Sequence, residues 1–141
     1  MIDALLPWPP TSNSMLTVWR GRKIASERYK QWISEARIGM QLQRQRPVKG
    51  PVEILIQLSS PTRRIYDLDN RIKPILDLLV GLDLIESDDM NTVTRIVVEK
   101  GEGFTGAWIL VTTTEERSIR ETKASHAEQE EGLHPFSEME A

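Results

Sequence analysis

The sequence has 141 residues, of which 39% are hydrophobic and 28% charged, and these proportions suit one globular domain with a sizeable core. It contains no cysteine, which excludes a disulfide framework and thiolate metal sites and is compatible with a reducing, cytoplasmic location. No apolar run approaches the roughly 20 residues that a membrane helix needs, so no membrane association is expected.

The net charge of −3 conceals an uneven distribution along the chain. Residues 1–64 carry a net charge of +7, residues 65–114 carry −5, and residues 115–141 carry −5. A basic surface suggests a polyanionic partner, and a compact acidic cluster beside it suggests a cation site. The alternative is ordinary charge mixing on a solvated surface.

The first half of the chain predicts a strand, a hairpin and a helix. Residues 2–7 are apolar enough for a strand, which the following prolines end. Residues 16–25 contain two short extended pieces around Arg20-Gly21-Arg22, a pattern typical of a hairpin. Ser26 is a suitable helix N-cap, and apolar residues at helical spacing predict a helix to about residue 44.

The second half predicts three strands, a helix and a tail. Alternating apolar residues mark a strand at 52–58, and a helix is expected from about 70 to 82. Two further strands are expected at 93–99 and 107–113, and Trp32 and Trp108 lie on patterned faces that favour the core. These elements predict a single α+β domain over 1–114, with a mixed β-sheet and two helices packed against it. Residues 115–141 are expected to form a flexible acidic tail, within which a short helix near 115–125 is compatible with the sequence.

Two aspartates one residue apart, Asp67 and Asp69, form the most informative acidic motif. If this segment is extended, both side chains project in the same direction, and a divalent cation removes their mutual repulsion. Carboxylate oxygens without nearby cysteine or histidine favour Mg²⁺ or Mn²⁺. The pair Asp88-Asp89 offers a third ligand if the predicted helix returns the chain to the site, and Asp83 and Glu86 are further candidates.

Lys73 is expected on the same helix face as Asn70 and Asp77, beside the acidic pair. A lysine next to a metal site can stabilise the charge that develops in phosphoryl transfer. The alternative is a surface ion pair between Lys73 and Asp77, worth about 0.3–0.5 kcal/mol.

At this point the sequence resembles the RusA-type crossover-junction endodeoxyribonucleases, which are small Holliday-junction resolvases of phages and prophages. The resemblance spans nearly all of residues 4–114 and is carried by four blocks in order. They are the proline-rich stretch 6–13, Arg20-Gly21-Arg22 with Ser26-Glu27, the segment 67–77, and Asp88-Asp89.

The resemblance implies a homodimer that binds a four-way DNA junction and cuts two strands symmetrically in DNA recombination and repair, using Mg²⁺ or Mn²⁺ and no organic cofactor. It implies that Asp67, Asp69 and Asp89 bind the metal, with Asp88 as an alternative third ligand. It further implies that Lys73 is needed for cleavage and that Asn13 belongs to the DNA-facing proline-rich block.

Basic residues near these motifs are candidates for contacts with the DNA backbone: Arg20, Arg22, Lys23, Arg63, Arg64 and Arg71. Trp8 and Trp19 could stack at an opened crossover, or could instead cover the core. Two other functions compete with the nuclease. One is a junction-binding structural protein without catalysis, which the intact acid and lysine set disfavours. The other is a sugar-nucleotide transferase using the Asp-X-Asp motif, which the short chain disfavours.

Overall fold

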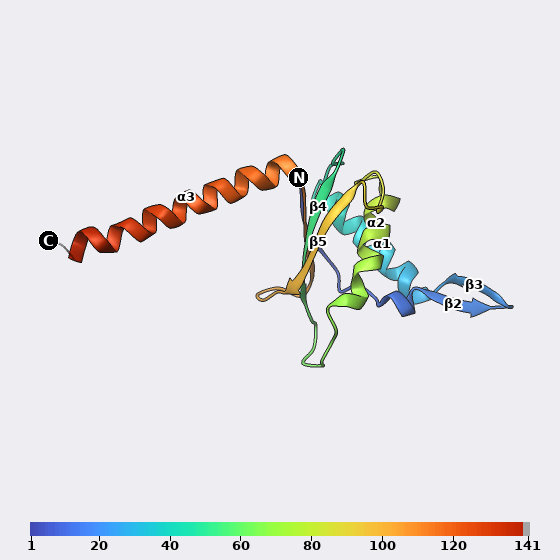
Figure 1. The fold of residues 1–141 in the computed structure, drawn as a ribbon. Coiled ribbons are helices and arrows are strands. Elements are labelled where there is room, and N and C mark those ends of the chain that lie inside the picture. Colours follow the sequence, from blue (N-terminus) through green and yellow to red (C-terminus); the bar gives the residue numbers. More distant parts are fainter. Residues whose placement is uncertain (140–141) are drawn as a thin grey trace.

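The computed structural model describes the backbone of residues 1–139 and the side chains of residues 1–129 (Figure 1). Its elements are β1 (Ile2–Leu6), η1 (Ser12–Ser14), β2 (Leu16–Trp19), β3 (Arg22–Ala25), α1 (Glu27–Leu42), β4 (Val52–Ser59), η2 (Asp69–Arg71), α2 (Ile72–Gly81), β5 (Val93–Lys100), β6 (Gly106–Thr113) and α3 (Thr114–Met139). This order confirms the predicted succession of strand, hairpin, helix, strand, helix and two strands.

The main sheet is mixed, as predicted, with the strand order β1-β6-β4-β5. Strand β6 runs antiparallel to β1 and β4, whereas β4 and β5 are parallel and pair from Val52 opposite Val93 onward. Consecutive parallel strands need a crossover, and α2 lies on the connection that returns the chain from the end of β4 to the start of β5. Residues 60–71 therefore follow the end of β4, whereas residues 82–92 lead to the start of β5.

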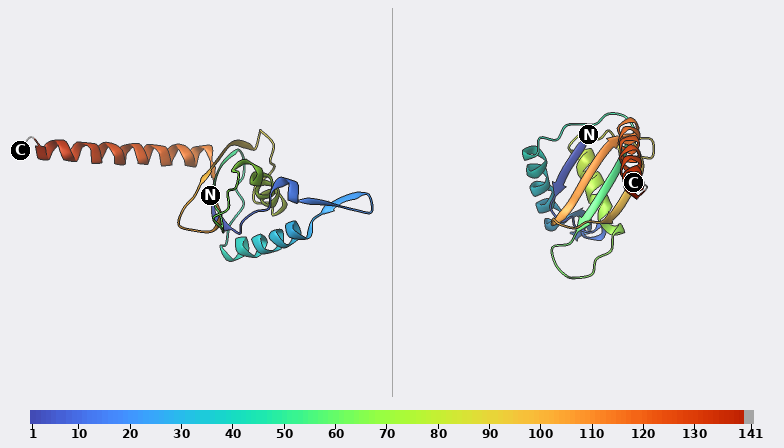
Figure 2. Two further views of the ribbon diagram at one scale, coloured as in Figure 1. Left: turned by 90° about the horizontal axis from the view of Figure 1, so that it is seen from below. Right: turned by 90° about the vertical axis from the view of Figure 1, so that its left-hand side faces the viewer.

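One face of the sheet packs against α1 and α2 to form the core (Figure 2). Strand β4 alternates strictly between buried and half-buried residues, so its apolar series Val52, Ile54, Ile56 and Leu58 faces the helices. Helix α1 begins at the predicted cap, where the Ser26 hydroxyl accepts a hydrogen bond from the Tyr29 amide at 3.1 Å. Its buried residues include Trp32, which confirms the prediction for that side chain.

The opposite face of the sheet contacts only the start of α3 among the helices described over residues 1–139, and Trp108 lies on this face with 42% of its surface exposed. Its indole Nε1 donates to the Asp3 carboxylate at 2.5 Å, and its ring meets Phe104 edge-on at 5.6 Å. The prediction that Trp108 belongs to the core was wrong. Alternation along β6 buries Ala107 and Ile109, so it places Trp108 on the face opposite α1 and α2.

The predicted tail contains a 26-residue helix, α3, which extends away from the body on the side opposite the β2–β3 hairpin (Figures 1 and 2). Reciprocal hydrogen bonds start it, because the Thr113 amide donates to Glu116 at 2.9 Å and the Glu116 amide donates to the Thr113 hydroxyl at 3.2 Å. Arg117 then joins Glu53 on β4 and Glu121 one turn further on, each at 2.8 Å.

The helix expected near 115–125 therefore begins earlier and runs much longer than the sequence suggested. The flexibility of the tail stays a prediction, and its last two residues lie outside the described part of the chain. Across residues 1–139, no helix combines the length and the apolar character that crossing a membrane requires.

Candidate active site

Asp67 and Asp69 lie at the end of the sheet where β4 finishes, on the segment that leads into α2. Asp69 opens the short helix η2, and the intervening Leu68 already has helical backbone angles (φ −78°, ψ −31°). The segment is therefore not extended throughout as expected, because the chain starts to turn into α2 between the two aspartates. Both carboxylates are exposed and accept no hydrogen bond or ion pair from any described residue.

Lys73 lies in the first turn of α2, close behind the acidic pair along the chain. Its ammonium Nζ lies 3.3 Å from the Asp77 carboxylate, so the surface ion pair considered as an alternative is present. The Lys73 side chain is nevertheless 61% exposed. An exposed i,i+4 pair is weak, so the ammonium can exchange Asp77 for a phosphate at small cost.

The proline-rich block lies beside this segment. Helices η1 and η2 are in contact, and the Ser12 hydroxyl donates to the Asn70 carbonyl at 3.1 Å. Asn13, the middle residue of η1, is exposed. The fold thus brings Asn13 next to the element that carries Asp69, although 56 residues of sequence separate them.

An open cavity of about 750 Å³ adjoins the acidic pair at the ends of β4 and β5. Asp67, the arginines Arg63 and Arg64 of the preceding loop, and the loop after β5 contribute to its wall. Two residues of this wall, Lys100 and Glu102, were not predicted from the sequence. They could have been found from their position at the end of β5, because parallel strands such as β4 and β5 end at the same edge of a sheet.

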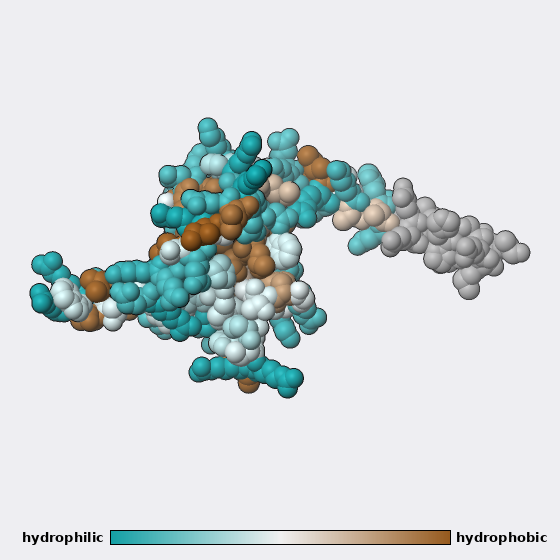
Figure 3. All heavy atoms as spheres, turned by 180° about the vertical axis from the view of Figure 1, so that it is seen from behind, coloured by the Kyte–Doolittle hydropathy of each residue, from teal (hydrophilic) through white to brown (hydrophobic). Residues whose placement is uncertain are grey.

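The hairpin β2–β3 projects from the body (Figure 3). It carries three of the predicted DNA contacts, Arg20, Arg22 and Lys23. Its two-residue turn has positive φ at Arg20 (51°) and Gly21 (77°), the geometry that matches the twist of a tight hairpin. Trp19 is 56% exposed with the Arg20 guanidinium 4.3 Å from its ring centre, so it does not belong to the core. Trp8, in contrast, is half-buried against the core.

Arg71 was expected to contact DNA, but its side chain is only 5% exposed. One guanidinium nitrogen donates to the carbonyl of Pro9, and the group lies 4.5 Å from the ring centre of Trp8 and 5.0 Å from that of Tyr66. Burial, reinforced by the nearby charge of Arg28, lowers the pKa of Arg71. Because Arg71 is buried, little of its side chain can contact a phosphate. The sequence alone did not indicate that Trp8 and Tyr66 would pack against it.

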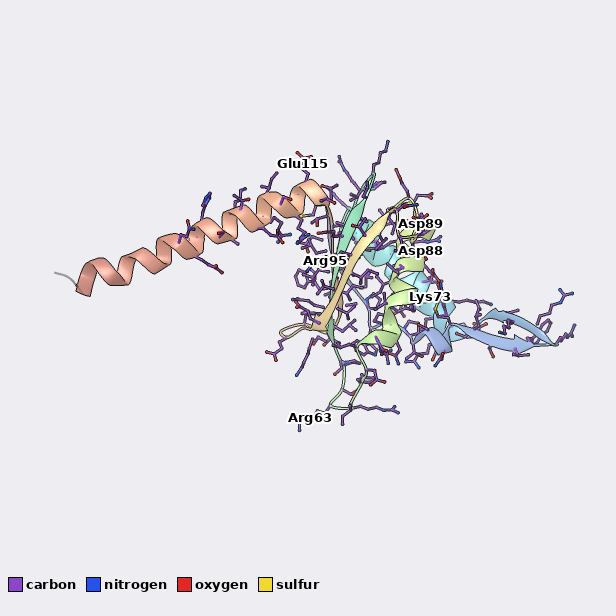
Figure 4. The ribbon with its side chains drawn as sticks, viewed as in Figure 1. Arg63, Lys73, Asp88, Asp89, Arg95 and Glu115 are labelled. Atoms are coloured by element: carbon purple, nitrogen blue, oxygen red, sulfur yellow. The ribbon has the colours of Figure 1, made fainter. Side chains whose placement is uncertain are left out.

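Asp88 and Asp89 lie on the loop between α2 and β5, after the end of α2, whereas the acidic pair precedes its start. Figure 4 shows Lys73 below Asp88 and Asp89, and Arg63 lower still. Asp89 lies four residues before Val93, where β5 first pairs with β4, and the Val93 amide donates to its carbonyl at 2.8 Å. Its carboxylate accepts from the Ser87 hydroxyl at 3.0 Å and from the Asn91 and Thr92 amides. These hydrogen bonds, the one from Ser87 foremost, lower the pKa of Asp89.

The structure does not show the expected convergence of the third acid on the first pair, because Asp67 follows the end of β4 whereas Asp89 lies before the start of the parallel strand β5. Among residues with described side chains, no group of three histidines, cysteines or acids is arranged to hold a metal ion. Asp67 and Asp69 fit a divalent cation by donor type, exposure and freedom from other partners, but they supply only two of its ligands.

Comparison with known proteins gives a family for this arrangement. The family model for the endodeoxyribonuclease RusA matches residues 7–112, which include η1, the hairpin, the acidic pair, Lys73 and Asp89. A comparison with curated protein sequences found no match.

Proposed function

The chain belongs to the RusA endodeoxyribonuclease family, and from this premise we propose that it is a divalent-metal-dependent nuclease that resolves four-way DNA junctions. The observation that supports this most directly is the gathering of unlike groups at one end of the sheet. Two exposed carboxylates, the exposed Lys73 and Asn13 lie on neighbouring elements near the end of β4, and a basic hairpin projects from the same domain. This combination would suit both a cation and a polyanion.

The proposed reaction is hydrolysis of a phosphodiester by in-line attack of water. Asp67 and Asp69 would hold Mg²⁺ or Mn²⁺, which when bound polarises water and neutralises charge on the phosphate oxygens. Lys73 would leave Asp77 and donate to a non-bridging phosphate oxygen, where negative charge builds as the new bond forms. Its position one turn after Asp69 keeps the ammonium on the helix end that faces the substrate.

The hairpin and the loop with Arg63 and Arg64 would bind the arms of the junction. All of their basic side chains are exposed, so they can reach phosphates without unfolding any part of the body. Such contacts give affinity without reading base sequence, which suits a ligand recognised by its branched shape. Trp19 stands at the tip of the hairpin and is available to stack on a base exposed at the crossover.

We also propose that the active enzyme is a homodimer. A four-way junction has near two-fold symmetry, and two copies related by a two-fold axis would present two equivalent cutting sites. Because α2 separates Asp89 from Asp67 within one chain, an antiparallel partner could bring its own Asp88-Asp89 loop to the acidic pair. The dimer would then complete the ligand set.

The test is cleavage of synthetic fixed and mobile four-way junctions beside linear duplex, with Mg²⁺, Mn²⁺ or EDTA. We expect paired incisions in junctions only, abolished in Asp69→Asn while junction binding in EDTA survives. Normal cutting by Asp69→Asn would refute the assignment of the acidic pair. Junction binding by the wild-type chain with no nicking in either metal would instead identify a catalytically inactive, junction-binding structural protein.

A further inference from the structure

Arg71 is a buried cation without a counter-ion. Its side chain is 5% exposed, no described carboxylate forms an ion pair with it, and its Nε is buried without a hydrogen-bond partner among the described residues. Burying an uncompensated charge costs free energy, so a chain retains one only where its other contacts are worth more. The contacts of Arg71 therefore indicate its role.

Those contacts join two distant parts of the chain. The guanidinium lies against the rings of Trp8 and Tyr66, whose centres are 5.1 Å apart in an edge-to-face arrangement. It also donates to the Pro9 carbonyl, and the neighbouring Asn70 carbonyl accepts from Ser12. We term the set of Trp8, Tyr66 and Arg71 the Arg71 clamp.

The Arg71 clamp brackets the acidic pair. Tyr66 immediately precedes Asp67, and Arg71 follows Asp69 by two residues, so both ends of this short segment are tied to the proline-rich block. The loop before it is exposed, with Ile65 94% exposed, and its side-chain hydrogen bonds are local ones among residues 60–66. The clamp is therefore the main restraint on where the two carboxylates point.

We propose that Arg71 is a positioning residue that holds Asp67 and Asp69 in the arrangement needed for cation binding, by stacking on Trp8 and Tyr66. The proposal rests on the proposed function for its use of a cation, but the restraint itself does not. Loss of the clamp frees the acidic segment, which weakens cation binding. It leaves DNA affinity unchanged, because exposed cations elsewhere supply that affinity.

The first measurement needs neither metal nor DNA. Trypsin cuts after Arg63 and Arg64, directly before the clamped segment, and cuts after Arg22 in the distant hairpin provide an internal reference. We expect Arg71→Met to accelerate cleavage at the loop but not at the hairpin. The matched control Arg37→Met removes an exposed arginine of α1 and should leave both rates unchanged.

The second measurement is Mn²⁺ binding by calorimetry, compared with junction affinity in EDTA. For Arg71→Met we expect Mn²⁺ affinity to fall about 10-fold or more, as for other residues that orient metal ligands, with junction affinity unaltered. Because Arg71→Met could unfold, a second pair of variants tests the same idea. Tyr66→Phe keeps the ring and loses the hydrogen bond to Thr62, so its Mn²⁺ affinity should stay near that of the wild type. Tyr66→Leu also removes the ring and should reproduce both the loose loop and the weaker binding.

The outcomes separate the proposals. Unchanged loop cleavage and Mn²⁺ affinity in both Arg71→Met and Tyr66→Leu would overturn the positioning role. A loss of junction affinity in EDTA for Arg71→Met, with Mn²⁺ affinity intact, would show that Arg71 contacts DNA instead. If the wild-type chain bound no Mn²⁺ and cut no junction, the proposed function would fail while the trypsin result still decided whether the restraint exists.

Discussion

Neutralising the three basic residues of the hairpin should lower the salt dependence of junction binding. The variant Arg20→Gln, Arg22→Gln, Lys23→Gln removes three exposed cations from a two-stranded element that forms its own separate sheet. Because the hairpin lies outside the core, this change should leave the free energy of unfolding of the body nearly unaltered. Binding and folding are thus separable at this element.

The size of the effect follows from counterion release. Each phosphate contact contributes about −0.9 to the slope of log affinity against log salt, so three lost contacts should reduce the slope by about 2.7. Between 50 and 200 mM salt, the wild type should therefore lose about 40-fold more affinity than the variant. At low salt the variant should bind more weakly than the wild type, and the difference should narrow as salt increases.

The assay is equilibrium binding of a fixed junction in EDTA over a salt series. A matched control replaces Arg37, Arg46 and Lys49, which are equally exposed but lie along α1 and beyond its far end. It changes the net charge by the same amount and should leave the slope near that of the wild type. Equal slopes in the wild type and the hairpin variant, or equal reductions in both variants, would refute the hairpin as a DNA-binding element.

Three further predictions concern the fold and the exposed groups. Gly106→Ala should lower the free energy of unfolding in urea by about 3 kcal/mol, because residue 106 has φ +119° and an added Cβ would overlap the Leu6 carbonyl oxygen. An unfolding midpoint equal to that of the wild type would contradict this prediction. Asp77→Asn removes an ion pair with the largely exposed Lys73, so it should change the free energy of unfolding by less than about 0.5 kcal/mol and should not reduce junction cleavage. A strong loss of cleavage would instead show that Asp77 takes part in the reaction directly. The hydrogen bond from the Thr113 amide is the main reason that the pKa of Glu116 is lowered in the folded protein. Ionised Glu116 therefore stabilises the start of α3 above its unfolded-state pKa, and this stabilisation is lost as the pH falls through its folded-state pKa. Helix content measured by circular dichroism should therefore fall on acidification below about pH 4.5 in the wild type and less in Glu116→Gln, and identical pH profiles would argue against the cap.

The local part of the fold was predictable because local signals agreed with one another. Strict alternation along β4 fixed the buried face, and Ser26 fixed the start of α1. The first turn of α3 carried a signal that sequence analysis overlooked, since Thr113 and Glu116 have the spacing of a capping box. Recognising it would have predicted a firm helix start at that point.

The missed features depend on contacts between distant segments. Alternation shows that Trp108 and its neighbours face opposite sides of the sheet, but it cannot show which side the helices cover. Arg71 looks like any arginine near an acidic motif until the fold places Trp8 beside it. The sequence also did not show that β5 runs parallel to β4. This direction determines at which end of the sheet Asp89 lies.

This parallel pairing leaves two sources for a third ligand at the acidic pair. Glu102 of the same chain shares the cavity wall with Asp67, whereas we propose that Asp89 reaches the pair from a second copy. The variant Asp89→Asn, alone and mixed with Asp69→Asn, distinguishes them. If Asp89 comes from a second copy, each variant should be inactive alone, and one site of a mixed dimer would combine an intact acidic pair with an intact Asp89 from the other chain, so nicking of one strand should return. If Glu102 completes the site within each chain, Asp89→Asn should cut by itself and Glu102→Gln should abolish cutting.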